Sequence, residues 1–373
     1  MDDTLRPSLL TPVYLVPELL PSPIPTNIPV TVTRAPIQIT TWPTLLPSGD
    51  TEINPLTGLS VEAAKLNRRP LGVKIANYPP DARPQSGLSF ADVVFEYEVE
   101  YHLSRFTAIY WGNDAVPELG PIRSLRLVDT ELMSIFQSVL VTSGGHPAVK
   151  MRITEGKEWA AGYKRIMCPE VPFLGEGGTM RRILKPGRRY ELTLYSDTAS
   201  LWGLVDKRGI NQRPDLDGMF AFSNSAPQGG REATHLQVVY IAGSSEAEYR
   251  YDPLSRTYRR FDLGRPTTDA LTGRQIAPSN VLVFFVNHVD SDIVVDQRNP
   301  SHPWYSLDIQ LWGQGPARLM RDGQVYECQW LRQNPQRADD RLVVVDPQGK
   351  QMPFHPGPTW IELVRLDAKV QID

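Results

Sequence analysis

Hydrophobic and polar side chains alternate along residues 91–111, which read ADVVFEYEVEYHLSRFTAIYW. Successive side chains of a β-strand point to opposite faces of its sheet, so this alternation predicts two strands joined by a turn. The first strand would separate apolar from acidic residues: Phe95, Tyr97, Val99 and Tyr101 on one face, Glu96, Glu98 and Glu100 on the other. An acidic strand face usually lies in solvent, and we expect that here. The run PLGVKIAN at 70–77 predicts a buried strand before this pair.

A helical period replaces the alternation after GPIRSLRLVDTELM, residues 120–133. Apolar residues recur at Val128, Leu132, Ile135 and Phe136, which predicts a helix that ends near residue 138. The next run, SVLVTSGGHPAVKMRI, predicts a strand, a Gly-Gly loop and a second helix. Strands and helices therefore mix in this part of the chain.

Past residue 230 the pattern changes to short alternating runs separated by turn residues. YDPLSRTY, RDGQ and DPQGK lie between such runs and are typical of β-hairpins. We predict an α+β protein with a mixed α/β N-terminal domain at 53–215 and a mainly antiparallel β C-terminal domain at 230–368. Residues that break regular structure gather in NQRPDLDG and NSAPQGG, which predicts a boundary between about 200 and 232.

Prolines recur throughout residues 1–52 and favour an extended segment or stalk over helix and central strand. The pieces between the prolines, such as IQITTWPTLL at 37–46, are too apolar for a freely solvated linker. We expect residues 36–47 to contact their own chain. Residues 1–35 fit either a stalk or a segment that adds as a strand to a neighbouring copy.

Composition mainly excludes classes of function. The net charge is −3, so we expect no bulk electrostatic binding to nucleic acid. No run approaches the ~20 apolar residues of a membrane-spanning helix, and the first residues lack the layout of a signal peptide. Cys168 and Cys328 fit one disulfide or, as we favour, two unpaired thiols. Without a metal-ligand spacing, a phosphate-binding loop or a dinucleotide motif, we expect no cofactor and no metal.

Two arginines, Arg123 and Arg126, stand where the predicted helix begins. The helix dipole makes cations unfavourable there, so we expect an anion beside them. A ligand could supply it, held also by backbone N–H groups of the Gly144-Gly145 loop. Alternatively Glu96 and Glu100 supply it, in an internal network that needs no ligand. The residues alone leave both interpretations open.

The motifs of this half resemble the N-terminal domain of the YerB-like family of bacterial proteins: NPLTGLS, RRPLGVKIAN, ARPQSGLSFADVVFE, SRFTAIY, GPIRSLR and SGGHPA. GPARLMRDGQVYECQW and FHPGPTWIELV resemble its C-terminal domain, and the likeness covers roughly residues 54–366. The family is largely of unknown function, and its typical members are exported lipoproteins of bacterial envelopes with links to cell-wall synthesis. The resemblance implies a two-domain, extracytoplasmic protein, tethered or secreted, whose signal or anchor is not present in this chain.

The family-like polar positions lie in loops at strand ends, where rigid scaffolds usually hold binding groups. With the neighbouring carboxylates and Arg105 they make up the predicted binding site: Asn77, Arg83, Gln85, Ser86, Glu96, Glu100, Arg105, Arg123, Arg126, Ser143, Gly144, Gly145 and His146. No residue in this set is predicted to be catalytic.

Three functions fit these features. We favour an exported, non-catalytic envelope protein that binds an anionic cell-wall precursor, a glycan or a wall-synthesis partner. The first alternative is a hydrolase or transferase acting on a phosphate-bearing envelope substrate, with Glu96 or Glu100 in acid–base chemistry. The second is a structural protein that self-associates through residues 1–52.

Overall fold

The computed structural model describes residues 49–155, 165–169, 179–241, 243, 245–332 and 341–373. The prediction of an extended segment or stalk therefore lies, up to residue 48, outside the described residues. Strands hold 43% of the residues and helices 15%, so the fold is mixed α+β, as predicted.

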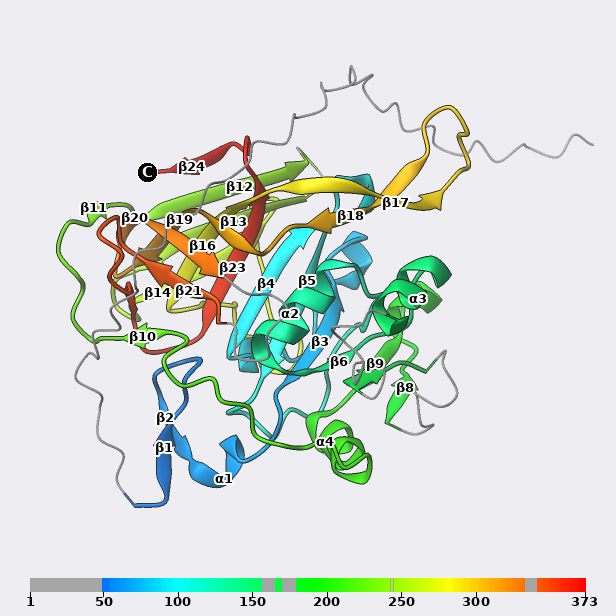
Figure 1. Cartoon of the computed structure of the whole chain (residues 1–373), viewed down its shortest axis with the longest axis horizontal. Helices are drawn as coiled ribbons and strands as arrows, with labels where there is room; N and C mark the ends of the chain where they lie inside the picture. The colour runs from blue at the N-terminus through cyan, green and yellow to red at the C-terminus, as the bar shows by residue number, and fades with distance from the viewer. Residues whose placement is uncertain (1–48, 156–164, 170–178, 242, 244, 333–340) are drawn as a thin grey trace, which may run out of the picture. The chain divides into compact units, whose positions relative to one another are not determined.

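One sheet of 11 strands runs through both halves of the sequence (Figure 1). From edge to edge its strands are β11 (Arg231–Glu232), β20 (Gln324–Arg332), β19 (Gly313–Arg321), β16 (Asn280–Val286), β23 (Thr359–Arg365), β4 (Val93–Glu98), β5 (Ser104–Tyr110), β3 (Leu71–Ala76), β6 (Val139–Val141) and β7 (Ile166–Met167), with β21 (Val343–Val345) added to β20.

The last long strand, β23, joins the two halves. It lies between β16 and β4 and runs parallel to both. Most other pairs of the C-terminal half are antiparallel, as the hairpin signals predict. Those signals report only neighbours in sequence, so they could not predict a parallel strand that crosses to the N-terminal half.

The remaining strands form smaller sheets. The five-stranded sheet has the order β15 (Arg265–Pro266), β14 (Thr257–Asp262), β13 (Ser245–Asp252), β12 (His235–Ile241) and β24 (Val370–Ile372). The two-stranded sheets pair β1 (Thr51–Ile53) with β2 (Ser60–Glu62), β8 (Met180–Arg182) with β9 (Leu194–Ser196), β10 (Ala221–Phe222) with β22 (Pro353–Phe354), and β17 (His288–Asp296) with β18 (Trp304–Ile309).

The α-helices of the described part are α1 (Ala63–Leu66), α2 (Val128–Phe136), α3 (Pro147–Glu155) and α4 (Thr198–Lys207). Single 3-10 turns occur at η1 (Pro80–Ala82), η2 (Leu88–Phe90), η3 (Glu100–His102) and η6 (Tyr190–Leu192). The predicted strand at 70–77, the helix from Val128 and the order strand, Gly-Gly loop, helix are confirmed by β3, α2, β6 and α3. No helix among the described residues is long and apolar enough to cross a membrane.

The central strands are covered on both faces, and every residue of β3 and β4 is buried. On one face, Phe95 of β4 packs in a core with Leu132 and Phe136 of α2. On the opposite face the core includes Leu201 of α4 and Tyr249 of the five-stranded sheet. The main sheet is therefore the middle layer of the structure.

The three glutamates of the predicted acidic face are buried, so our expectation that this face lies in solvent is wrong. Glu96, Glu98 and Glu100 are 1%, 5% and 5% exposed, and they pair with Arg260 of the five-stranded sheet, Arg365 of β23 and Arg126 before α2, respectively. Carboxylates buried to this degree must be paired, and each has a basic or polar partner in the structure. Tyr101 also leaves the predicted apolar face: it turns into the left-handed region with φ 65° and is 36% exposed.

The predicted boundary region packs against the C-terminal half along part of its length. Leu216, Met219 and Phe220 are buried, and the ring of Phe220 stacks on Phe354 with 5.0 Å between centroids. Exposed residues concentrate in the stretch 224–229. Cys168 and Cys328 are both buried and form no disulfide.

Limited proteolysis tests how the halves are joined. We expect a broad-specificity protease to cut within 223–230, where exposed residues concentrate, or before residue 53, where the sequence is rich in proline. The fragments on either side of 223–230 should co-elute in gel filtration without denaturant, because β23 and β4 pair between them. Separate elution of these fragments, or first cuts inside 138–145 or 281–286, would contradict this account.

Candidate functional site

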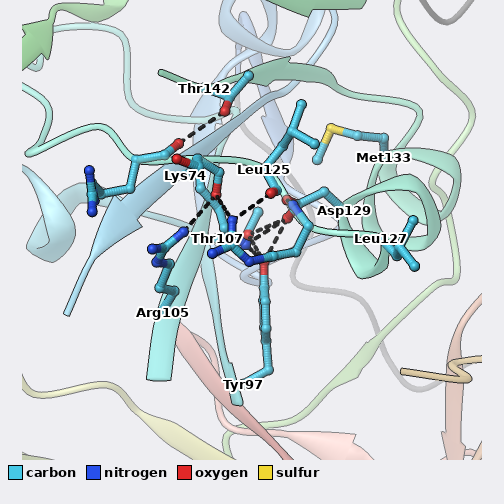
Figure 2. A network of polar contacts seen from close by, with 12 residues as sticks. Lys74, Tyr97, Arg105, Thr107, Leu125, Leu127, Asp129, Met133 and Thr142 are labelled. Atoms are coloured by element: carbon cyan, nitrogen blue, oxygen red, sulfur yellow. Dashed lines mark hydrogen bonds and ion pairs between the residues drawn. The ribbon is translucent and has the colours of Figure 1, made fainter. Parts of the chain in front are cut away.

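The carboxylate of Asp129 lies at the start of α2 and collects donors from three strands (Figure 2). Its Oδ1 accepts hydrogen bonds from Lys74 Nζ of β3 at 3.0 Å, Tyr97 Oη of β4 at 2.6 Å and Thr107 Oγ1 of β5 at 3.0 Å. Its Oδ2 accepts from the backbone N–H of Arg126 at 2.6 Å. Asp129 therefore ties the helix to the sheet and provides the anion that a helix start favours.

Lys74 is the buried basic partner of Asp129 and also contacts the hydroxyl of Tyr97. Burial lowers the pKa of Lys74 to about 7; Arg126 and Arg105 add to this lowering, and Asp129 opposes it. Neither Lys74 nor Asp129 was in the predicted site. The available signal was a lysine within the apolar run LGVKIA, since a buried lysine requires a partner.

Three partly buried arginines lie close to one another and to this anchor, and we call Arg105, Arg123 and Arg126 the arginine cluster. Nη1 of Arg105 donates to the carbonyl oxygen of Ser124 at 3.1 Å, and Nη1 of Arg126 reaches the same oxygen at 3.4 Å. Burial, together with Arg126 and Arg123, holds the pKa of Arg105 well below its usual range. These side chains are crowded cations at the loop before α2.

Only one member of the arginine cluster has a carboxylate partner among the described residues. Arg126 Nε donates to Glu100 Oε2 at 2.6 Å, as the internal-network interpretation predicts. Arg123 instead donates to the carbonyl oxygen of Glu191 at 3.3 Å, and its Nε is buried without a hydrogen-bond partner in the described part of the chain. Burial lowers the pKa of Arg123 as well. Two of the three arginines in the cluster therefore form no ion pair with a carboxylate in the described part of the chain.

The predicted Gly-Gly loop lies directly beside the arginine cluster. Gly144 has φ 128°, a conformation that favours glycine, and its carbonyl accepts the N–H of Leu125 at 2.8 Å. A Cβ at Gly145 would lie 3.0 Å from the Leu125 side chain, so the two loops approach closely. The N–H of Ser143 donates to the carbonyl of Arg123 at 3.1 Å. The two loops therefore lie side by side, and His146, directly before α3, has its Nδ1 buried.

The rest of the predicted site forms a separate buried network, centred on Glu96. Arg260 of β14 donates to Glu96 Oε2 at 2.7 Å, so the predicted pairing of Glu96 with Arg123 or Arg126 is wrong. Asn77 Nδ2 donates to Glu96 Oε1 at 3.1 Å, and Arg83 lies 2.8 Å from Asp262. Because Arg260 and Asp262 come from the C-terminal half, this network crosslinks the two halves.

Gln85 and Ser86 are the last two residues of the predicted site, and the structure places them apart from the arginine cluster. Gln85 Nε2 donates to the carbonyl of Ala76 at 3.0 Å, close to the Glu96 network. Ser86 Oγ donates to Glu118, away from the arginine cluster. The predicted site therefore divides into the arginine cluster with its loops and the Glu96 network.

Glu362 of β23 is a further buried acid that the sequence analysis missed. Tyr240 and Tyr249 donate hydrogen bonds to its carboxyl group. Burial and the nearby Glu96 raise the pKa of Glu362 well above its usual range. A glutamate inside the apolar run TWIELV was the signal, but its partners lie more than a hundred residues away.

Comparisons with known proteins place this architecture in a family. Residues 56–211 match the model described as "Protein of unknown function (DUF3048) N-terminal domain", and residues 236–361 match its C-terminal domain. The chain is 32% identical over 318 residues to "Putative lipoprotein YerB" of Bacillus subtilis (strain 168), which covers 84% of this chain and 87% of that protein. The chain belongs to the DUF3048 family.

A solved structure of a DUF3048 relative agrees with the fold. The crystal structure of the YerB protein from Bacillus subtilis matches with a TM-score of 0.67 at 29% identity, covering 85% of this chain and 99% of the other. The resemblance inferred from the motifs, with an N-terminal and a C-terminal domain, is therefore confirmed.

The lowered pKa of Lys74 predicts a pH dependence of stability for this DUF3048 chain. Between about pH 7 and pH 10.5 the unfolded chain binds a proton at Lys74 that the folded chain has lost, so the free energy of unfolding should rise with pH. Below pH 7 both states hold the proton and the contribution is constant. Urea melts at pH 7 and pH 9 should show this rise in the native protein and a smaller one in Lys74→Met.

Other groups that titrate between pH 7 and pH 9 contribute equally to the native protein and to Lys74→Met. Their contributions therefore cancel when the two pH dependences are subtracted. Lys74→Met should also be less stable at pH 7, by about 3–5 kcal/mol, because Asp129 keeps its burial and loses its basic partner, and this difference should grow at pH 9. Equal pH dependence in the two proteins would show that Lys74 does not titrate in this window.

Proposed function

We propose that this DUF3048 protein is an envelope-associated, extracytoplasmic protein, tethered or secreted, that binds an anionic ligand without catalysing a reaction. The ligand class is a cell-wall precursor, a glycan or a wall-synthesis partner that carries phosphate or carboxylate. The description of the Bacillus subtilis relative as "Putative lipoprotein YerB" supports the proposed location at the envelope.

The arginine cluster is the observation that carries the ligand class. Guanidinium groups recognise phosphate and carboxylate through paired N–H donors. Arg105 and Arg123 bond to backbone carbonyls and have no carboxylate within 4.0 Å among the described residues, so their charge is available. Burial and then repulsion from Arg126 and Arg123 lower the pKa of Arg105, and an anion bound between the arginines would relieve the repulsion. The adjoining Gly144-Gly145 loop supplies backbone close to the same point.

The placement of the acids supports binding over catalysis. Glu100 is bonded to Arg126 and Glu96 to Arg260, both with little exposure, so neither is open for acid–base work in this structure. Asn77, Arg83 and Gln85 take part in or adjoin the network between the halves, and we assign them a supporting role behind the ligand site.

Arg105→Ala tests the ligand site with the least damage to the fold, because its guanidinium bonds to a backbone carbonyl and leaves no carboxylate unpaired. Inorganic pyrophosphate is a suitable probe, titrated by calorimetry or NMR at fixed salt. Loss of one charge-assisted hydrogen bond should weaken binding about tenfold or more.

Arg259→Ala is the matched control, since it removes an exposed arginine of β14 and changes the net charge equally. We expect pyrophosphate affinity close to native in this variant. Equal affinities in native protein and Arg105→Ala, or equal weakening by both substitutions, would show that the arginine cluster is not the binding site.

A further inference from the structure

The strand pairing along the outer side of β20, at the edge of the main sheet, is interrupted. Residues 324 and 325 pair with β11, and residues 329–331 pair with β21. Between these partners, residues 326–328 have β19 on one side and no described strand on the other. An unpaired strand edge offers backbone N–H and C=O groups to another extended chain.

A groove opens at this interruption, lined by residues of the stretches 223–231, 325–327 and 346–353. Its floor is Val325, Tyr326 and Glu327, and its walls are the segments 223–231 and 346–353. Tyr326 Oη donates to the carbonyl of Pro227 at 3.0 Å, which fixes one wall to the floor. The groove is therefore a built feature of the C-terminal half.

Polar side chains that line the groove are largely engaged within the protein. Asp346 Oδ1 accepts the N–H groups of Gln348 and Lys350 at 2.9 Å each, and Gln351 Nε2 donates to two backbone carbonyls at 3.0 Å. Glu327 is paired with Arg318. The groove also presents exposed apolar residues, such as Ala226 and Pro347, beside the edge of β20. A strand edge next to apolar surface suits an extended peptide.

The chain enters the described structure next to this groove. The carbonyl of Thr57, in the turn between β1 and β2, accepts the N–H of Gly357 at 2.7 Å. Gly58 in the same turn packs so closely on Phe222 that a Cβ would lie 2.4 Å from its ring. Phe222 immediately precedes Ser223, the first residue of the groove wall. The hairpin that carries the N-terminal segment is thus fixed beside the groove.

The N-terminal segment has the composition that the groove suits. Residues 36–48 read PIQITTWPTLLPS and contain no charged residue. The run IQITT alternates β-branched with polar residues, as pairing strands do. Ile39 stands 12 residues before Thr51, a span that reaches up to about 40 Å when extended.

We infer that residues 37–42 of the same chain occupy the groove and pair with β20 at residues 326–328. A short tether gives the segment a local concentration on the order of millimolar, so its own chain outcompetes a dilute second copy. Occupancy buries Trp42 and fills the interruption in the sheet edge. The N-terminal segment is then a strand of the C-terminal half rather than a free stalk at this point. This inference does not depend on the anion site.

Hydrogen exchange of the full chain, followed in peptides that span β20, tests the inference. In antiparallel pairing alternate N–H groups point to the same side, so one or two amides of 326–328 face the groove. These amides should exchange at least about tenfold slower in the native protein than in the double variant Ile37→Asp/Ile39→Asp. The double variant Val30→Asp/Val32→Asp, in the other β-branched run, should match the native protein.

Exchange in β16 serves as the folding control and should be unchanged in both variants. The native rates should also be independent of protein concentration. Equal exchange in native protein and Ile37→Asp/Ile39→Asp would overturn the inference. Protection that is lost on dilution would assign the segment to a neighbouring copy, and sensitivity to Val30→Asp/Val32→Asp would assign a different segment; either result contradicts the proposal.

Discussion

The buried carboxylate of Asp129 is the interaction on which the N-terminal half depends. It accepts hydrogen bonds from Lys74, Tyr97 and Thr107 on three neighbouring strands and from the backbone of Arg126. A carboxylate buried so completely is stable only with such partners, so the sheet and α2 can dock in one relative position. That position fixes the loop that carries the arginine cluster.

The pairing of the nearby carboxylates with other residues explains why the arginine cluster remains open to a ligand. Asp129 is held by the strands, and Glu96 is held by Arg260 of the C-terminal half. Glu100 alone is left to the cluster, where it pairs with Arg126. Asp129 thus holds the N-terminal half together and Glu96 links it to the C-terminal half, which leaves Arg105 and Arg123 without an ion-pair partner among the described residues.

The sequence predicted what depends on local pattern and missed what depends on long-range pairing. Alternation and helical spacing gave β3, β4, β5 and α2, and the Gly-Pro turn pointed to Arg123 and Arg126. The partner of Glu96 could not be predicted, because Arg260 comes close only once β23 has inserted beside β4. Lys74 and Asp129 meet for a similar reason, because the three strands β3, β4 and β5 must pair and α2 must dock on them first. A lysine in an apolar strand signals that such a partner exists, not which residue it is.

The central claim is that Asp129 positions the arginine cluster for an anion, and pyrophosphate affinity in Asp129→Asn tests it most directly. The substitution keeps the size of the side chain and removes one negative charge close to the cluster. Simple electrostatics predicts tighter anion binding after that loss. The positioning account predicts weaker binding, because the loop at Arg126 loses its fixed anchor. Equal or tighter binding by a folded Asp129→Asn protein would contradict the account.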